Sequence, residues 1–151
     1  SPFNAFTFIQ GLETLPLRMQ RHCQNAEKVA NFLENHNKVE KVIYPSLMKD
    51  QYLERAKKHL NEGFGALLGF ELKDGVEAGK NFINNLKLFY HVANIGDARS
   101  LAIHPSSTTH SQLSEKEQLS SGVTPGYVRL SIGIEHIDDI LEDLEQALSS
   151  S

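Results

Sequence analysis

Arg129 is the side chain in this sequence whose type and setting best suit the binding of a small anion. It lies in the run YVRLSIG at residues 127–133, where apolar and polar residues alternate. Successive side chains of a strand point to opposite faces, so Arg129 and Ser131 should share one face and the apolar residues the other. A guanidinium binds a carboxylate through paired hydrogen bonds, and burying an arginine among apolar neighbours is costly without an anion. The pattern alone also fits an arginine on a solvated face or in a structural ion pair.

Asn94 is a second candidate for binding, because its amide can both donate and accept hydrogen bonds. It follows a predicted strand and precedes Gly96-Asp97, a dipeptide typical of turns. An asparagine in this position can equally bond to its own backbone and have only a turn-forming role.

A cluster of hydroxyl side chains occupies residues 106–109, between His104 and His110. Such hydroxyls can cap a helix, bind an anion or orient an arginine, and a polar capping loop accounts for most of them. Because no cysteine or third ligand clusters with the two histidines, we predict no metal site.

The other acidic side chains and the cysteine have structural interpretations. Asp97, Glu135 and the pair Asp138-Asp139 are interpreted as caps and solvated helix charges, since acids are favourable in the first turn of a helix. Cys23 falls on the apolar stripe of a predicted helix and is interpreted as a packing residue.

Alternating helices and short strands must position these candidates. Apolar residues recur at intervals of three and four from Leu15 to Leu33, which predicts a long amphipathic helix beginning near Thr14. We expect the other helices at residues 3–13, 52–60, 76–86, 115–120 and 137–148, and strands at 39–43, 66–72, 88–93, 100–103 and 127–132. This order predicts an α/β two-layer sandwich, in which helices cover one face of a small, mostly antiparallel sheet.

Composition limits the class of protein. The chain has 151 residues, 40% of them hydrophobic, which suits one domain with one core. A net charge of −4 argues against a nucleic-acid partner, and no apolar run approaches the roughly 20 residues of a membrane span. The single cysteine fits a reducing cytoplasm. The apolar start, with Phe3, Phe6 and Phe8 and no initiator methionine, leads us to expect a piece of a longer protein; the alternative is a terminus docked on its own core.

Motifs at both ends of the chain resemble those of the Cys/Met-metabolism enzymes that use pyridoxal phosphate. The resembling segments are SPFNAF at 1–6, QGLETL at 10–15, RMQRH at 18–22, HVANIGDARSL at 91–101, HPSSTTH at 104–110 and YVRLSIGIE at 127–135. The resemblance implies the small C-terminal domain of a fold type I enzyme. Residues 1–151 would form that single domain, with residues 1–35 as a long helical segment linking it to the rest.

The resemblance also assigns roles to the candidate residues. It implies that Arg129 and Asn94 bind the substrate carboxylate. It also implies that Thr109 helps to orient Arg129 without binding the substrate itself. Asparagine followed by a small aliphatic residue and Gly-Asp, as at residues 94–97, is the pattern of the O-acetylhomoserine sulfhydrylases, which form homocysteine and acetate from O-acetyl-L-homoserine and sulfide. Cystathionine γ-synthase, cystathionine γ-lyase and methionine γ-lyase remain alternatives, as does a free-standing α/β binding module.

The cofactor site of this family is not expected within the chain. The family's cofactor-binding lysine follows Ser or Thr, and no lysine in this sequence does. We therefore expect no catalytic and no cofactor-binding residue here, so that pyridoxal phosphate belongs to the full-length parent and the fragment alone is inactive. The resemblance further implies an upstream cofactor-binding domain as partner and a cytoplasmic homo-oligomer, a homotetramer, for the full-length enzyme.

Overall fold

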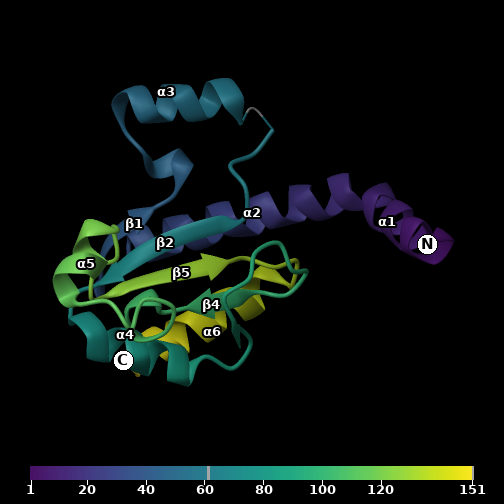
Figure 1. The fold of residues 1–151 in the computed structure, drawn as a ribbon. Helices are drawn as coiled ribbons and strands as arrows, with labels where there is room; N and C mark the ends of the chain where they lie inside the picture. The colour runs from purple at the N-terminus through teal and green to yellow at the C-terminus, as the bar shows by residue number, and fades with distance from the viewer. Residues whose placement is uncertain (61, 151) are drawn as a thin grey trace.

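The N-terminal part of the chain consists of two consecutive helices. In the computed structural model, which describes residues 1–60 and 62–150, α1 spans Pro2–Glu13 and α2 spans Leu15–Glu34. Thr14 is the N-cap of α2, and Pro16 lies in its first turn, where a proline removes no helical hydrogen bond. Figure 1 shows α1 extending away from the rest of the molecule. The helix start predicted near Thr14 is confirmed.

A five-stranded sheet forms the centre of the fold in the described part of the chain. Its strands are β1 (Val39–Ile43), β2 (Leu67–Leu72), β3 (Tyr90–His91), β4 (Leu101–Ile103) and β5 (Tyr127–Ser131). Their order is β1-β2-β5-β4-β3, and all neighbours are antiparallel except β3 and β4. The mostly antiparallel sheet is therefore confirmed, and β5 is its central strand.

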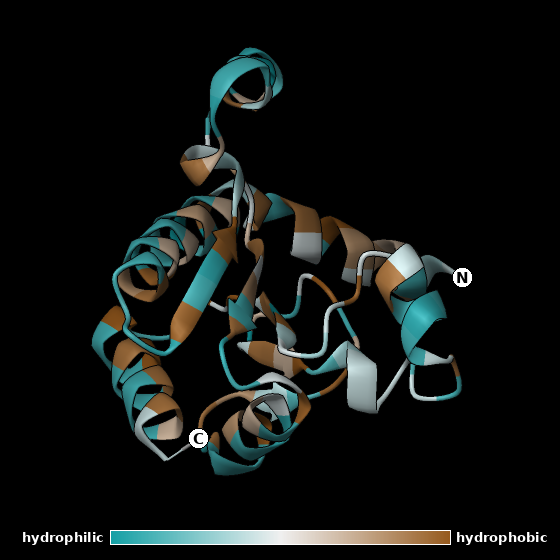
Figure 2. Ribbon diagram, turned by 90° about the vertical axis from the view of Figure 1, so that its left-hand side faces the viewer, coloured by the Kyte–Doolittle hydropathy of each residue, from teal (hydrophilic) through white to brown (hydrophobic). Residues whose placement is uncertain are grey.

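Three helices cover one face of this sheet, namely α2, α4 (Gly75–Asn85) and α6 (Ile137–Ser149) (Figures 1 and 2). Figure 2 shows hydrophobic residues along the strands and helices that meet in this layer. The β5 side chains of Val128 and Leu130 are completely buried beneath the helices, and the rings of Phe70 and Phe82 pack edge to face with centroids 5.4 Å apart. The predicted two-layer α/β arrangement is confirmed.

Two shorter helices lie outside this layer. The first, α3 (Asp50–His59), contributes no buried residue and stands away from the sheet in Figure 1, joined through the 3-10 turn η1 (Pro45–Leu47). The second, α5 (Glu115–Ser120), has the predicted bounds and begins at the N-cap Ser114. The hydroxyl and backbone N–H of Ser114 both donate to the Glu117 carboxylate, and these bonds lower the pKa of Glu117.

The strand predicted at residues 88–93 is wrong in length, because β3 contains only Tyr90 and His91. At its end, the Val92 N–H donates back to the Tyr90 carbonyl at 3.1 Å and forms a turn. At its start, the cause is a carboxylate from α6. Asp143, buried at 6% exposure, accepts the backbone N–H groups of Lys87 and Leu88 at 2.9 Å and of Phe89 at 3.3 Å. These N–H groups are bonded to a helix and not to a neighbouring strand, so sheet pairing begins only at Tyr90.

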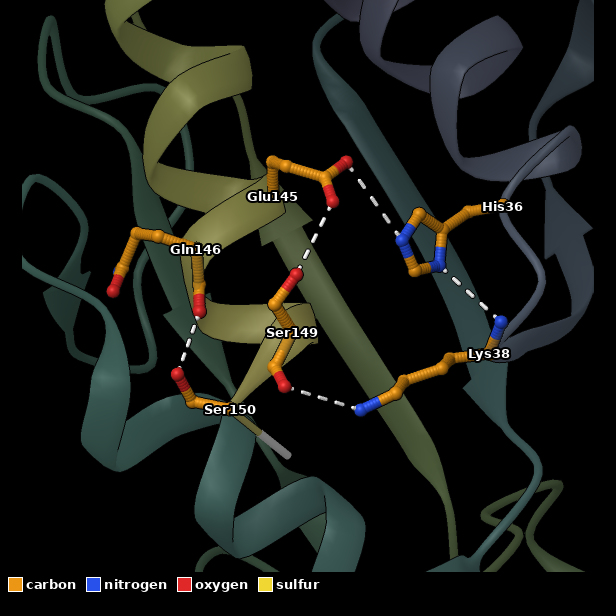
Figure 3. Close-up of polar contacts among 6 residues, drawn as sticks. All are labelled: His36, Lys38, Glu145, Gln146, Ser149 and Ser150. Carbon is orange, nitrogen blue, oxygen red and sulfur yellow. Dashed lines mark hydrogen bonds and ion pairs between the residues drawn. The ribbon is translucent and has the colours of Figure 1, made fainter.

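Polar contacts join the turn after α2 to the end of α6 (Figure 3). The Lys38 ammonium donates to the Ser149 carbonyl at 3.4 Å, and His36 Nε2 lies 3.8 Å from a carboxylate oxygen of Glu145. The C-terminal ends of α2 and α6 are thereby attached to each other.

The domain predicted over residues 1–151 also includes Asn61 and Ser151, which lie outside the described residues. In the ranges that are described, no helix combines the length and apolar character needed to cross a bilayer.

Candidate functional site

Arg129 lies on the face of the sheet that is not covered by the helical layer. Tyr127, Arg129 and Ser131 alternate with the buried residues of β5, as the sequence pattern predicts. The Arg129 side chain is half-buried, and its neighbours across the sheet are Gly69 on β2 and Ile103 on β4. Neither neighbour carries a charge, and Arg129 forms no ion pair with any residue that the structure describes. A structural ion pair therefore does not account for this arginine.

A cavity of about 250 Å³ adjoins Arg129. Met48, Leu67 and Tyr127 form part of its wall. The Tyr127 ring lies over Gly69, where a Cβ atom would be only 2.5 Å from the ring, so a glycine is needed at that position. Burial raises the pKa of the Tyr127 hydroxyl, and the nearby positive charge of Arg129 opposes that rise. Because apolar walls replace part of the water around the guanidinium, its attraction for an anion is stronger here than in open solvent.

The structure brings Asn94 to Arg129 although the two residues are far apart in the sequence. Arg129 Nη2 donates to the backbone carbonyl of Asn94 at 3.3 Å, and the Asn94 side chain is exposed. Gly96, with φ of +80°, turns the chain here, and its N–H donates to the Ser131 hydroxyl at 3.3 Å. The loop after β3 thus holds Asn94 beside the guanidinium, with its amide still free to meet a ligand.

Among the described residues, the hydrogen bond of the Thr109 side chain is to a neighbour in its own loop. Its hydroxyl lies 2.9 Å from His110 Nδ1, and no hydrogen bond joins it to Arg129 among the residues described. The neighbouring hydroxyls form hydrogen bonds within or close to their own loop, as expected for a polar capping loop. Ser106 donates to the Gln118 side chain at 2.7 Å, and Thr108 donates to the His104 carbonyl at 2.8 Å.

His104 is a buried structural residue in this loop. Its Nε2 lies 2.8 Å from the Pro125 carbonyl and its Nδ1 lies 2.8 Å from the Ser107 hydroxyl. Since a carbonyl can only accept, Nε2 carries the proton and Nδ1 accepts from Ser107. Burial lowers the pKa of His104. Both ring nitrogens are therefore occupied by protein partners, which leaves neither for a metal ion.

Glu135 is not the solvated charge or helix cap that the sequence analysis describes. Its carboxylate accepts the backbone N–H of Ser100 at 2.7 Å and the Ser100 hydroxyl at 2.9 Å. Behind it, the buried Asn25 of α2 donates to the carbonyls of Gly133 and Glu135, each at 3.0 Å. The sequence feature that could have indicated this buried contact is Asn25, a polar residue within the apolar stripe of the long helix, next to Ala26.

This arrangement is suited to holding a carboxylate and not to acid–base chemistry. The guanidinium has several N–H donors and uses one of them on the carbonyl of Asn94. The residues around it do not fit a pyridoxal phosphate site, because no lysine lines the cavity at Arg129.

Comparisons with known proteins identify the family of the chain. Residues 1–149 match the Cys/Met metabolism PLP-dependent enzyme family. The chain is 62% identical to the O-acetyl-L-homoserine sulfhydrylase of Leptospira meyeri and 48% identical to an L-methionine gamma-lyase of Fusobacterium nucleatum. These matches cover 99% and 97% of the chain but only 34% and 37% of the relatives, so the chain spans about a third of their length.

A solved structure gives the same result for the fold. The putative O-acetylhomoserine (thiol)-lyase of Campylobacter jejuni, determined with an N'-pyridoxyl-lysine-5'-monophosphate, superposes on 99% of the chain with a TM-score of 0.89 and 47% sequence identity. The chain covers 36% of that protein. This chain belongs to the Cys/Met metabolism family of PLP-dependent enzymes.

Proposed function

We propose that this chain is the C-terminal, substrate-binding domain of an O-acetylhomoserine sulfhydrylase, and that Arg129 binds the α-carboxylate of the amino-acid substrate. The observation that carries the proposal is a half-buried guanidinium that lies beside Asn94 and has no carboxylate partner among the residues the structure describes. The parent reaction would convert O-acetyl-L-homoserine and sulfide to L-homocysteine and acetate. The identity of 62% to a relative with that name supports this choice.

The contribution of this domain to the reaction is orientation. Pyridoxal phosphate, bound elsewhere in the parent, supplies the electron sink for the chemistry at the substrate. Arg129 and Asn94 fix the carboxylate, which decides which bond of the substrate Cα is aligned with the cofactor. Holding a reacting group in one orientation removes part of the entropic barrier. No residue of this chain is assigned a proton-transfer step.

A methionine γ-lyase is the second candidate for the parent. Its support is the 48% identity to the Fusobacterium nucleatum enzyme over nearly the whole chain. The two candidates share the carboxylate clamp and differ in what happens at the substrate side chain. Product analysis of the full-length protein, with O-acetylhomoserine plus sulfide in one assay and methionine alone in another, separates them.

We propose that this domain packs against other parts of the same enzyme. Helix α1 has no buried residue, and Phe3, Phe8 and Leu12 are exposed by 75%, 72% and 63%. This apolar surface supports the proposal that residues 1–35 link the domain to an upstream cofactor-binding domain of a homo-oligomeric enzyme. The free thiol of Cys23 is compatible with a reducing cytoplasm.

The test is replacement of Arg129 in the full-length protein. Arg129→Ala should lower kcat/KM for O-acetylhomoserine by about a hundredfold and leave the bound cofactor unchanged, because a charge-assisted bidentate contact is lost. Arg129→Lys should recover part of this loss, since an ammonium cannot reproduce the planar fork. Arg55→Ala, at an exposed arginine of α3, is the matched control and should be near wild type. An unchanged kcat/KM for Arg129→Ala, or loss of cofactor instead, would refute the proposal.

A further inference from the structure

Residues 94–100 run beside residues 129–135 as an irregular parallel seam. Hydrogen bonds join Asn94 to Arg129 at 3.3 Å, Gly96 to Ser131 at 3.3 Å and Ala98 to Ile134 at 2.9 Å. Every second residue of the loop contacts β5 or the segment after it. Ile95, between two of these residues, is 59% exposed. The position of Asn94 beside Arg129 therefore depends on the register of this seam.

Glu135 fixes the far end of the seam. Its two carboxylate oxygens accept the backbone N–H and the hydroxyl of Ser100, at 2.7 and 2.9 Å. Ser100 is fully buried, and its hydroxyl in turn accepts the N–H of Gly133 at 2.9 Å. Hydrogen bonds to an ionised carboxylate are stronger than those between neutral groups. Ser100 is thus held on both sides by the segment that follows β5.

The segment that holds Ser100 is itself fixed. A Cβ atom at Gly133 would lie 2.5 Å from the Ser100 nitrogen, so the two backbones are in the closest contact that a glycine permits. On the other side, the buried Asn25 donates to the carbonyls of Gly133 and Glu135. The His22 ring is hydrogen-bonded through Nδ1 to the Ile132 carbonyl at 2.6 Å. Helix α2 therefore supports the Glu135 segment from behind.

We propose that Glu135 is a positioning residue for substrate binding, which keeps Asn94 and the Arg129 guanidinium in register through its hold on Ser100. This inference rests on the proposed function of Arg129 as the carboxylate ligand. Residues 91–99 are all exposed, so the loop has little packing of its own to define its path. Without the carboxylate, Ser100 loses two hydrogen bonds, the loop shifts along β5, and the Asn94 carbonyl no longer restrains the guanidinium.

The experiment uses the full-length protein with Glu135→Ala, Glu135→Gln and Ser100→Ala. Glu142→Gln, at an exposed position of α6, is the control for loss of one negative charge. We expect Glu135→Ala to raise KM for O-acetylhomoserine about tenfold with a smaller change in kcat, since bonds to a charged group are lost. The amide hydrogens of residues 94–100 should exchange faster. Glu135→Gln keeps one acceptor for Ser100 and should restore part of both properties.

The outcomes separate this inference from the proposal on which it rests. If Arg129→Ala raises KM but Glu135→Ala and Glu135→Gln change neither KM nor amide exchange, the positioning role is wrong and the carboxylate role stands. A fall in kcat with unchanged KM would also overturn it, because that is the result of a general folding defect. If Arg129→Ala itself leaves kcat/KM unchanged, the proposed function fails, whatever the exchange data show for the loop. Should Glu135→Ala not fold, Glu135→Gln and Ser100→Ala decide the question.

Discussion

Replacing Gly79 with alanine should destabilise the protein, although alanine is the better helix former. Gly79 is a buried position of α4, and a Cβ atom there would lie 2.5 Å from Cδ2 of the His104 ring. That ring cannot move aside, because it is 1% exposed and both its nitrogens are hydrogen-bonded at 2.8 Å. Overpacking of this kind costs about 1–3 kcal/mol, and the lost hydrogen bond to Pro125 adds about 1 kcal/mol. The higher helix propensity of alanine offsets about 1 kcal/mol of this cost in the free energy of unfolding.

The net expectation for Gly79→Ala is a loss of about 1–3 kcal/mol in the free energy of unfolding. Urea unfolding of the chain, followed by far-UV circular dichroism, measures it. Gly11→Ala is the matched control, because Gly11 is also helical but has no atom within 4 Å of an added Cβ. Its stability should be unchanged or higher by up to about 1 kcal/mol.

A double-mutant cycle tests the cause. His104→Ala removes the ring and should itself cost about 2–4 kcal/mol through its cavity and lost hydrogen bonds. In that background Gly79→Ala should become neutral or stabilising, so the two changes should be strongly non-additive. Equal costs of Gly79→Ala with and without the ring, or no cost in the wild type, would show that His104 is not the obstacle.

Three further predictions concern charge and cofactor. Burial lowers the pKa of His104 in the folded protein. The neutral side chain therefore contributes fully to stability above the pKa of a histidine in the unfolded chain, about 6.5, and contributes less as the pH falls below it. The difference in the free energy of unfolding between the wild type and His104→Gln should thus shrink from about pH 7 to about pH 5. Asp143→Ala leaves three backbone donors near Phe89 without their acceptor and should cost about 3–5 kcal/mol in urea unfolding, whereas Asp139→Ala, at an exposed position of the same helix, should cost under about 1 kcal/mol. The isolated chain should retain no stoichiometric visible absorption band after mixing with pyridoxal phosphate and dialysis, since no lysine lines the Arg129 cavity; a stable band would contradict this.

The sequence predicts the elements whose signals are local. The long helix beginning near Thr14 follows from its apolar period, and the short helix α5 has the bounds predicted for it. The alternation in residues 127–132 correctly places Arg129 on the opposite face from the core. In each case the residues that interact are close together in the chain, so the pattern is visible without the fold.

The acidic residues could not be assigned in the same way. Glu135, before α6, and Asp143, on its buried face, each accept backbone N–H groups from a distant loop. The residues near them in the sequence do not predict that Ser100 or Lys87 is the hydrogen-bond partner. The same holds for β3, whose predicted length is wrong because a helix more than fifty residues later takes the N–H groups before it. Long-range hydrogen bonds decide these features, and a single sequence does not reveal them.

The contacts behind Arg129 also indicate which parts of the molecule can influence it. Asn25 joins α2 to the segment that holds Ser100, and the seam from Ser100 leads back to Asn94 at the guanidinium. A change in the orientation of α2 must therefore be accommodated at residues 132–135, next to the clamp. Helix α3 has no buried residue, and none of the hydrogen bonds in this series comes from it, so substitutions there should leave the clamp undisturbed. The proposed carboxylate site is thus part of one hydrogen-bonded unit with α2.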